Sequence, residues 1–148
     1  MVDVNFDFLH FVPAQSAPDF IRNSELAASN GWVDVNRDTL QHLKFPNVFA
    51  LGDAANLPTS KTAAAVFSQT PVLIHNLLKQ MGMKKTTAAY DGYTSCPLFV
   101  GDNKLMLMEF KYGGVRQESF FANQEVPRKS FFYLTRDVLP RAYFQRMP

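Results

Sequence analysis

One short segment limits the possible folds of this chain more than any other. Residues 47–51 form an apolar run of strand length, which stops at Gly52-Asp53 and leads into a helical pattern rich in small residues. Such a run is typical of a strand covered on both faces of a parallel sheet. Ligands of open α/β sheets bind at the carboxyl ends of the strands. The segment therefore predicts an α/β fold with a candidate ligand site at Gly52-Asp53.

The residue types at this turn suit a nucleotide ligand. Gly52 would let a ligand approach the backbone closely, and the Asp53 carboxylate would accept hydrogen bonds from sugar-type hydroxyl groups. The small side chains of residues 63–65 would keep the following helix close to that ligand. A Gly-Asp pair at a strand end is nevertheless common, so the residues alone fit a plain strand, turn and helix equally well.

Hydrophobic periodicity and turn residues predict the remaining elements. They are a strand over residues 4–12, a small hairpin over 31–41, a helix over 60–82, a strand over 104–112 with Phe120 and Phe121 as its hairpin partner, and helices over 130–147. Thr59 or Ser60 is the expected N-cap of the helix over 60–82, and Gly82 its stop signal. Pro71 predicts a kink or two helices near Thr70, because proline removes a helical hydrogen bond.

Composition and spacing exclude several classes of function. The single cysteine, Cys96, excludes an internal disulfide and any multi-thiolate metal site. His10, His42 and His75 lie far apart in sequence, so no metal site is expected. Residues 104–148 hold eight Lys or Arg against four acids, but no zinc spacing or basic run supports nucleic-acid binding. The N-terminal run contains acids and reads as the inside of a fold rather than a targeting peptide, and no apolar run is long enough to predict a transmembrane helix.

Several unusual segments together resemble a known family. Residues 46–66, PNVFALGDAANLPTSKTAAAV, resemble the second flavin-contacting motif of flavoproteins built from two dinucleotide-binding domains. More narrowly, NLPTSKTAAAV at 56–66 and YDGYTSCP at 90–97 resemble sulfide:quinone oxidoreductases of the eukaryotic mitochondrial type. The segments LHFVPAQSAPDF and GWVDVNRDTLQH agree with the same family, so the resemblance covers nearly the whole chain.

The resemblance implies the C-terminal part of a Rossmann-like α/β flavoprotein, ending in a strand hairpin and amphipathic helices. Residues 1–30 would be the end of the second nucleotide-binding domain, 31–83 the returning part of the FAD-binding domain, and 84–148 a region on the redox-cysteine, membrane and quinone side. Gly52 and Asp53 would contact the ribityl chain of FAD. Only half of the FAD site is expected, because the Gly-rich pyrophosphate turn has no counterpart in this sequence.

The resemblance also implies a role for Lys61 and Thr62 at the flavin end of the site. A helix N-terminus and an ammonium group beside the flavin would stabilise the negative charge that develops on its reduction. The alternative is that Lys61 is a solvated lysine of the first helical turn.

Cys96 lies in a segment that reads as a turn-rich loop before Pro97. A lone cysteine is most often a small buried hydrophobic residue. The resemblance instead implies one of two redox cysteines, which oxidise hydrogen sulfide and pass sulfur to an acceptor and electrons through FAD to quinone. The partner cysteine would lie outside this chain.

Residues 130–147 combine aromatic side chains with arginines at helical spacing, which fits either an interfacial amphipathic segment or a helix packed on the core. The resemblance implies association with the mitochondrial inner membrane. The sequence departs from the family at Ala14, at Pro71 and at Pro148, beyond which the family continues. We expect a fragment or short variant that is inactive alone. The alternatives are a non-catalytic fragment that binds a partner or a membrane, and an NADH:quinone oxidoreductase-like flavoprotein.

Overall fold

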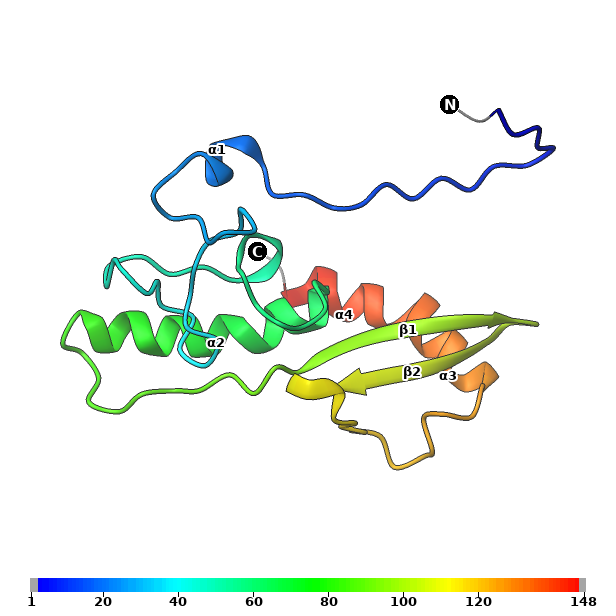
Figure 1. The fold of residues 1–148 in the computed structure, drawn as a ribbon. Coiled ribbons are helices and arrows are strands. Elements are labelled where there is room, and N and C mark those ends of the chain that lie inside the picture. Colours follow the sequence, from blue (N-terminus) through cyan, green and yellow to red (C-terminus); the bar gives the residue numbers. More distant parts are fainter. Residues whose placement is uncertain (1–2, 147–148) are drawn as a thin grey trace.

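The computed structural model describes residues 3–146 and contains both helices and strands. In chain order the elements are α1 (Asp19–Arg22), η1 (Gly52–Ala54), α2 (Ala63–Gln80), β1 (Thr94–Gly101), β2 (Lys104–Phe110), η2 (Tyr112–Gly114), α3 (Lys129–Tyr133), η3 (Leu134–Val138) and α4 (Leu139–Arg146) (Figure 1). The irregular segment between α1 and α2 lies toward one end of the molecule, the chain before α1 extends away from it, and the β1–β2 hairpin with α3 lies toward the other end (Figure 1).

Helix α2 begins and ends at residues with clear capping chemistry. The side-chain oxygen of Thr62 accepts a hydrogen bond from the Ala65 N–H, so Thr62 is the N-cap rather than Thr59 or Ser60. Gly82 follows the helix with a φ of 77°, a left-handed conformation typical of a C-terminal stop, as the sequence predicted. The helix continues through Pro71 as one element, so the alternative of two separate helices is wrong.

Strands β1 and β2 pair antiparallel, with Cys96 opposite Met108. The predicted strand over 104–112 is confirmed as β2, but its partner is β1 and not the segment of Phe120 and Phe121. Cys96 therefore lies in a strand, and the expectation of a turn-rich loop is wrong. The signal for this hairpin is the turn between the strands, where Asp102 and Asn103 both have positive φ, a conformation that Asp and Asn tolerate better than most residues.

Two other predicted strands do not form. Residues 4–12 contain no strand, and of residues 47–51 only Phe49 makes a bridge, an antiparallel one to Gln41. A strand needs a neighbouring strand to satisfy its backbone groups, and neither segment has a ladder of partners among residues 3–146. The parallel sheet expected from the apolar run is therefore not present in the described part of the chain, where the one sheet is the β1–β2 hairpin.

The core before α2 is small and is built from isolated bridges. Val33 pairs with Ala55, Val35 pairs with His42, and these buried residues pack against partly buried neighbours such as Leu26. The expected hairpin over 31–41 is thus present as a turn flanked by single bridges. Asn36 shapes that turn, since its side-chain oxygen accepts the N–H groups of two following residues.

The C-terminal helices run as one continuous helical path beside the hairpin (Figure 1). Phe131 of α3 is buried and packs edge-on against Phe120, while Leu105 of β2 is fully buried. The π-helical turn η3 comes directly before Pro140, the second residue of α4. Proline offers no N–H to the preceding turn, so a local widening of the helix at this point has a clear cause. Of the helices in residues 3–146, none has the length and hydropathy needed to cross a membrane.

Candidate functional site

The buried side-chain amide of Gln69 holds the Gly52-Asp53 turn against helix α2. The N–H of Gly52 donates to the side-chain oxygen of Gln69 at 2.7 Å, and Gln69 lies on the buried face of α2. Gly52 has a φ of 62°, and a Cβ at this position would meet Cγ2 of Val66 at 3.0 Å. Glycine is therefore required here both by backbone conformation and by space.

Lys61 closes the same turn from the other side. Its ammonium group donates to the carbonyl oxygens of Asp53 and Ala55 at 2.8 Å each, and lies 4.1 Å from the ring centroid of Trp32. Burial lowers the pKa of Lys61, and the nearby charge of Asp53 opposes that shift. Lys61 precedes the N-cap Thr62, so it is not a solvated lysine of the first helical turn, and its position is fixed by carbonyl groups and an aromatic face.

The carboxylate of Asp53 is free to accept hydrogen bonds. Asp53 is exposed, and its carboxylate makes no hydrogen bond within residues 3–146. It borders a cavity of about 440 Å³ whose other walls are mostly apolar and include Pro18, Phe20 and Trp32. The cavity thus offers one anionic acceptor among apolar surfaces, an arrangement suited to a largely apolar ligand that carries hydroxyl groups.

A second cluster lies where the N-terminus of α2 meets β1. The hydroxyl oxygens of Thr62 and Thr94 are 2.9 Å apart, and Thr94, which is buried, also donates to the Ser60 carbonyl at 3.3 Å. Cys96 follows two residues later on the same strand and is exposed. These contacts fix the strand of Cys96 against the start of α2.

Cys96 and Thr62 border one cavity of about 310 Å³. The remaining walls come mostly from α2, β1, β2 and the C-terminal helices, and include Thr135, Leu139 and Tyr143. The Thr135 hydroxyl is buried without a hydrogen-bond partner among the described residues. The cavity is therefore mainly apolar, and its polar lining residues are Cys96 and the hydroxyl residues Thr62, Ser95 and Thr135.

A buried carboxylate supports the hairpin behind this cavity. Glu109 of β2 accepts hydrogen bonds from the hydroxyl of Tyr93 at 2.5 Å, from Gln124 at 2.9 Å, and from the backbone and side chain of Ser119. Burial by itself would raise the pKa of Glu109, but the hydrogen bonds from Tyr93, Gln124 and Ser119 together lower it below the ordinary value. The network ties the segment after β2 to Tyr93, the residue before β1.

The structure divides the predicted site residues into two groups. Gly52, Asp53 and Lys61 gather around one turn, while Thr62 and Cys96 line the other cavity, and the short Ser60–Thr62 segment joins the groups. Asp53 and Cys96 border different cavities.

Sequence reasoning missed several residues that shape these clusters: Trp32, Gln69, Thr94 and Thr135. One of them left a usable signal. Gln69 follows Ala65 by four positions, so a polar side chain stands on the inward face of the helix. A polar residue on a buried face must find a hydrogen-bond partner.

Comparison with known proteins gives consistent relatives. The chain is 49% identical over 144 residues to the mitochondrial sulfide:quinone oxidoreductase of Schizosaccharomyces pombe, 44% identical to that of Mus musculus and 45% identical to that of Dictyostelium discoideum. These matches cover 94–97% of this chain. No protein-family profile matches the chain.

Among solved structures, the fold resembles a chain in the cryo-EM structure of the Tetrahymena thermophila mitochondrial ATP synthase. That match has a TM-score of 0.77 at 30% sequence identity, and covers 86% of this chain and 31% of the other. The chain spans only 31–32% of the length of the three curated relatives. In each comparison, then, the matched region is part of a chain about three times as long.

Proposed function

Since this chain corresponds to a C-terminal portion of mitochondrial sulfide:quinone oxidoreductases, we propose that it supplies one wall of the FAD site and one redox cysteine of such an enzyme. The whole enzyme would oxidise hydrogen sulfide to sulfane sulfur and pass the electrons to quinone, in mitochondria. The chain alone holds half of the cofactor site and one of the two sulfur groups that the chemistry needs, so we expect it to be inactive by itself.

The turn at Gly52 and Asp53 fits the sugar-alcohol part of a flavin cofactor. The buried Gly52 would shape the turn, and the exposed carboxylate of Asp53 at the cavity wall would accept hydrogen bonds from hydroxyl groups. Bound FAD would supply a two-electron acceptor at this place. Lys61 would keep the turn in shape by holding two of its carbonyl groups, and its charge would favour an anionic group nearby.

The observation that carries the proposal is the position of Cys96. Its side chain borders a mainly apolar cavity beside the start of the helix that follows the Gly52-Asp53 turn. Sulfide can add to a cysteine sulfur only by attacking a sulfur–sulfur bond, so that a persulfide forms and the second sulfur leaves as a thiolate with the electron pair. The chain has no other cysteine. The second sulfur must therefore come from a polypeptide region beyond these 148 residues or from a substrate.

The ATP synthase relative favours a second candidate function. A chain with this fold is part of that assembly in Tetrahymena thermophila. A non-catalytic role, in which the chain binds a larger protein complex, would use the same fold without Cys96 chemistry.

A chimera separates these two candidates. This chain replaces the homologous region of the Schizosaccharomyces pombe enzyme, to which it is 49% identical. The proposal predicts flavin absorbance and sulfide-dependent reduction of a soluble quinone. Cys96→Ser should keep the flavin and lose the reduction, because a hydroxyl cannot carry the sulfur. Asp102→Asn, at the tip of the same hairpin, is the matched control and should keep the activity. Equal rates in the Cys96→Ser variant and its parent would refute the catalytic role.

A further inference from the structure

The base of the β1–β2 hairpin is attached to the segment before α2 through Tyr112. Tyr112 follows β2, and its hydroxyl donates to the carbonyl oxygen of Arg37 at 2.7 Å. The guanidinium carbon of Arg37 lies 4.0 Å from the centroid of the same ring, as in a cation–π contact. The N–H of Tyr112 donates to the carbonyl oxygen of Asp91 at 3.1 Å. One residue therefore binds both the segment before α2 and the chain that leads into β1.

Gly92 is the second part of this attachment. It has a φ of 89°, and a Cβ there would lie 2.5 Å from the backbone nitrogen of Tyr112 and closer still to its ring. Both the ring and the backbone of Tyr112 are held by hydrogen bonds, so only glycine fits without a displacement. The carbonyl oxygen of Gly92 accepts a hydrogen bond from the hydroxyl of Thr59 at 2.9 Å. We call Arg37, Thr59, Gly92 and Tyr112 the hairpin clasp.

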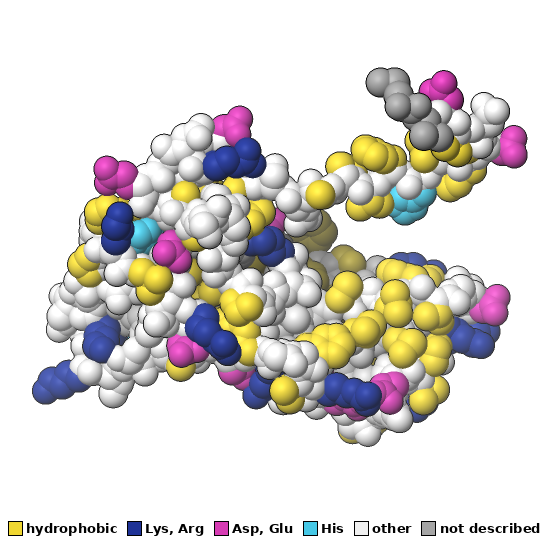
Figure 2. Space-filling model, in the orientation of Figure 1, with side chains coloured by type: hydrophobic (Ala, Val, Ile, Leu, Met, Phe, Trp, Pro, Cys, Tyr) yellow, Lys and Arg dark blue, Asp and Glu magenta, His cyan; other side chains and the backbone are white. Residues whose placement is uncertain are grey.

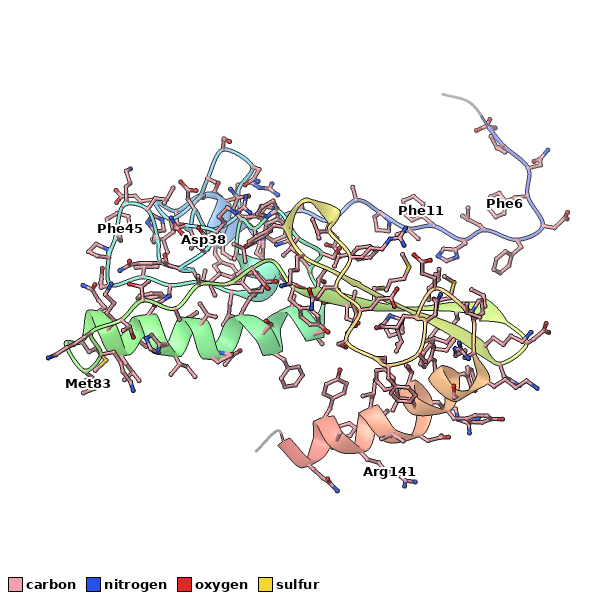
Figure 3. The ribbon with its side chains drawn as sticks, turned by 90° about the horizontal axis from the view of Figure 1, so that it is seen from below. Phe6, Phe11, Asp38, Phe45, Met83 and Arg141 are labelled. Atoms are coloured by element: carbon pink, nitrogen blue, oxygen red, sulfur yellow. The ribbon has the colours of Figure 1, made fainter. Side chains whose placement is uncertain are left out.

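The hairpin clasp connects the hairpin to the Gly52-Asp53 turn. Thr59 lies between that turn and α2, two residues before Lys61, which binds two carbonyl groups of the turn. A further connection comes from Asp38, whose carbonyl oxygen accepts the N–H of Tyr90 at 2.8 Å. Figure 3 shows Asp38 on the irregular segment, away from the C-terminal helices. Both ends of the hairpin are thus tied to the segment that forms the turn.

A single contact would leave the hairpin free to rotate about it. Thr94, the first residue of β1, is held by Thr62 and by the Ser60 carbonyl. The far end of the hairpin carries exposed apolar side chains, so no packed core fixes it there (Figure 2). Cys96 lies two residues after Thr94 and Gly92 two residues before it. A displacement at Gly92 would therefore be carried to Cys96 at about the same size.

We propose that the four residues of the hairpin clasp are positioning residues, which fix the place of Cys96 relative to the Gly52-Asp53 turn. The inference rests on the proposed function, because this place matters only if the sulfur of Cys96 reacts beside a cofactor held by the turn. A misplacement of about 1 Å can lower the rate of a reaction between bound groups about a hundredfold. None of the four residues lines the cavity of Asp53 or that of Cys96, so they act through Cys96 and not on a ligand.

The chain itself contains the two probes needed to measure this position. Trp32 is its only tryptophan and contacts Lys61 at the turn, while Cys96 is its only cysteine and is exposed. A thiol-reactive fluorescent label on Cys96 accepts energy from Trp32, and the decay of the Trp32 emission gives the distribution of distances between the two. We expect a narrow distribution in the parent chain.

Two variants each remove one hydroxyl from the hairpin clasp. Tyr112→Phe and Thr59→Val should each widen the distance distribution about twofold or more, because the hairpin gains freedom at its base. Thr59→Ser keeps the hydroxyl and should give the parent width. The matched control Thr86→Val removes a hydroxyl that contacts His75 in the loop after α2, and should also give the parent width. Parent widths in both clasp variants would overturn the proposal.

A second readout separates positioning from stability. In the chimera with the Schizosaccharomyces pombe enzyme, Tyr112→Phe and Thr59→Val should lower the limiting rate of flavin reduction by sulfide about tenfold or more per bound flavin. Thr59→Ser should keep the parent rate. Clasp variants that unfold at a lower temperature but keep the parent rate would show a purely structural role and overturn the proposal. A parent chimera that binds flavin but is not reduced by sulfide would instead refute the proposed function, and the distance measurement would still decide the position of Cys96.

Discussion

Gly52 is the residue at which conformation and space are most restricted in the candidate cofactor turn. Its left-handed φ of 62° and the nearby Cγ2 of Val66 both oppose a side chain. Gly82 also has a left-handed φ, of 77°, but a Cβ there would meet nothing within 4 Å. The two glycines therefore form a matched pair in which only one has a crowded site.

Alanine substitutions should separate the two effects. Gly82→Ala should lower the free energy of unfolding by about 1 kcal/mol, because the only cost is that of placing an alanine in the left-handed backbone conformation. Gly52→Ala should lower it by roughly 2 kcal/mol, because a clash with Val66 is added to that penalty. Denaturant unfolding of both variants measures the difference. Equal losses would mean that Val66 moves aside freely.

Glu109 gives a prediction on pH. Its lowered pKa means that the folded state holds the charged form more firmly than the unfolded state does. The stabilisation from Glu109 is therefore complete above the ordinary glutamate pKa of about 4.3, and is lost as the pH falls through the lower folded value.

Replacing Glu109 by glutamine should show this dependence. Glu109→Gln should lower the free energy of unfolding at neutral pH by about 2 kcal/mol. Both carboxylate oxygens of Glu109 accept hydrogen bonds, and glutamine replaces one of these acceptors by an NH₂ group. The variant should also lose less stability than the parent on acidification below about pH 4.5. Thermal unfolding from neutral to acid pH measures both effects. The exposed Glu25 serves as the control, and Glu25→Gln should follow the parent curve.

At the residue scale, the sequence predicts those roles that depend only on a residue and its neighbours along the chain. Gly82 as a helix stop follows from glycine's tolerance of left-handed backbone, and the structure confirms it. The roles of Gln69 and Glu109 depend on partners 10 to 17 residues away in sequence. No local pattern predicts such a pairing, because it is created by the packing of α2 and β2.

At the scale of elements, a prediction succeeds where the element makes its backbone hydrogen bonds within itself, and it fails where those bonds need another segment. Helix α2 was predicted because its hydrogen bonds are internal and its ends carry capping residues. The alternation of residues predicts the strand β2 but not its partner β1, because the turn residues before Cys96 favour a loop. The expected strands at 4–12 and 47–51 do not form because a strand depends on a neighbouring strand, which residues 3–146 do not provide for either segment.

The C-terminal helices allow a sharper membrane prediction than the sequence did. Phe131 is buried and Tyr143 stacks on Phe67, so these rings serve the fold. The exposed apolar side chains of this region are Tyr133, Val138 and Phe144. The predicted range of 130–147 ends at a residue outside the described part of the chain.

We expect the exposed group to carry any contact with a lipid surface. Changing Tyr133, Val138 and Phe144 to serine should weaken co-sedimentation of the chain with anionic liposomes, since aromatic rings favour the headgroup boundary. Circular dichroism should show an unchanged fold. Phe20→Ser, an exposed aromatic on α1, is the matched control. Equal sedimentation of the triple variant and the parent would rule out this anchor.

At the scale of the whole molecule, the chain has little core for its size. Val33, Val35 and Ala55 form a small buried cluster, and other buried apolar side chains such as Leu105 and Phe131 lie outside it. Large side chains on the N-terminal segment and on β1 remain exposed. The family resemblance read from the sequence is confirmed by the relatives. The Rossmann-like sheet that the resemblance implies is not present in residues 3–146, where the one sheet is the β1–β2 hairpin.

A partial site has a direct consequence for cofactor binding. The purified 148-residue chain should contain no stoichiometric flavin, because losing the contacts to half of a dinucleotide removes several kcal/mol of binding, roughly a thousandfold or more in affinity. The ratio of flavin absorbance to protein absorbance measures this. The chimera with the Schizosaccharomyces pombe enzyme is the positive control. A full equivalent of flavin on the isolated chain would contradict the expectation.

The hydroxyl groups of Thr62 and Thr94 can share their protons in two ways, since either oxygen can be the donor in their contact. When Thr94 donates its proton to the Ser60 carbonyl, its oxygen receives the proton of Thr62. Thr62, which also accepts the Ala65 N–H, then keeps one lone pair and no proton. In that arrangement, a polar group that meets Thr62 in the cavity of Cys96 must bring its own N–H or O–H, and a thiolate or a carbonyl oxygen finds no donor there.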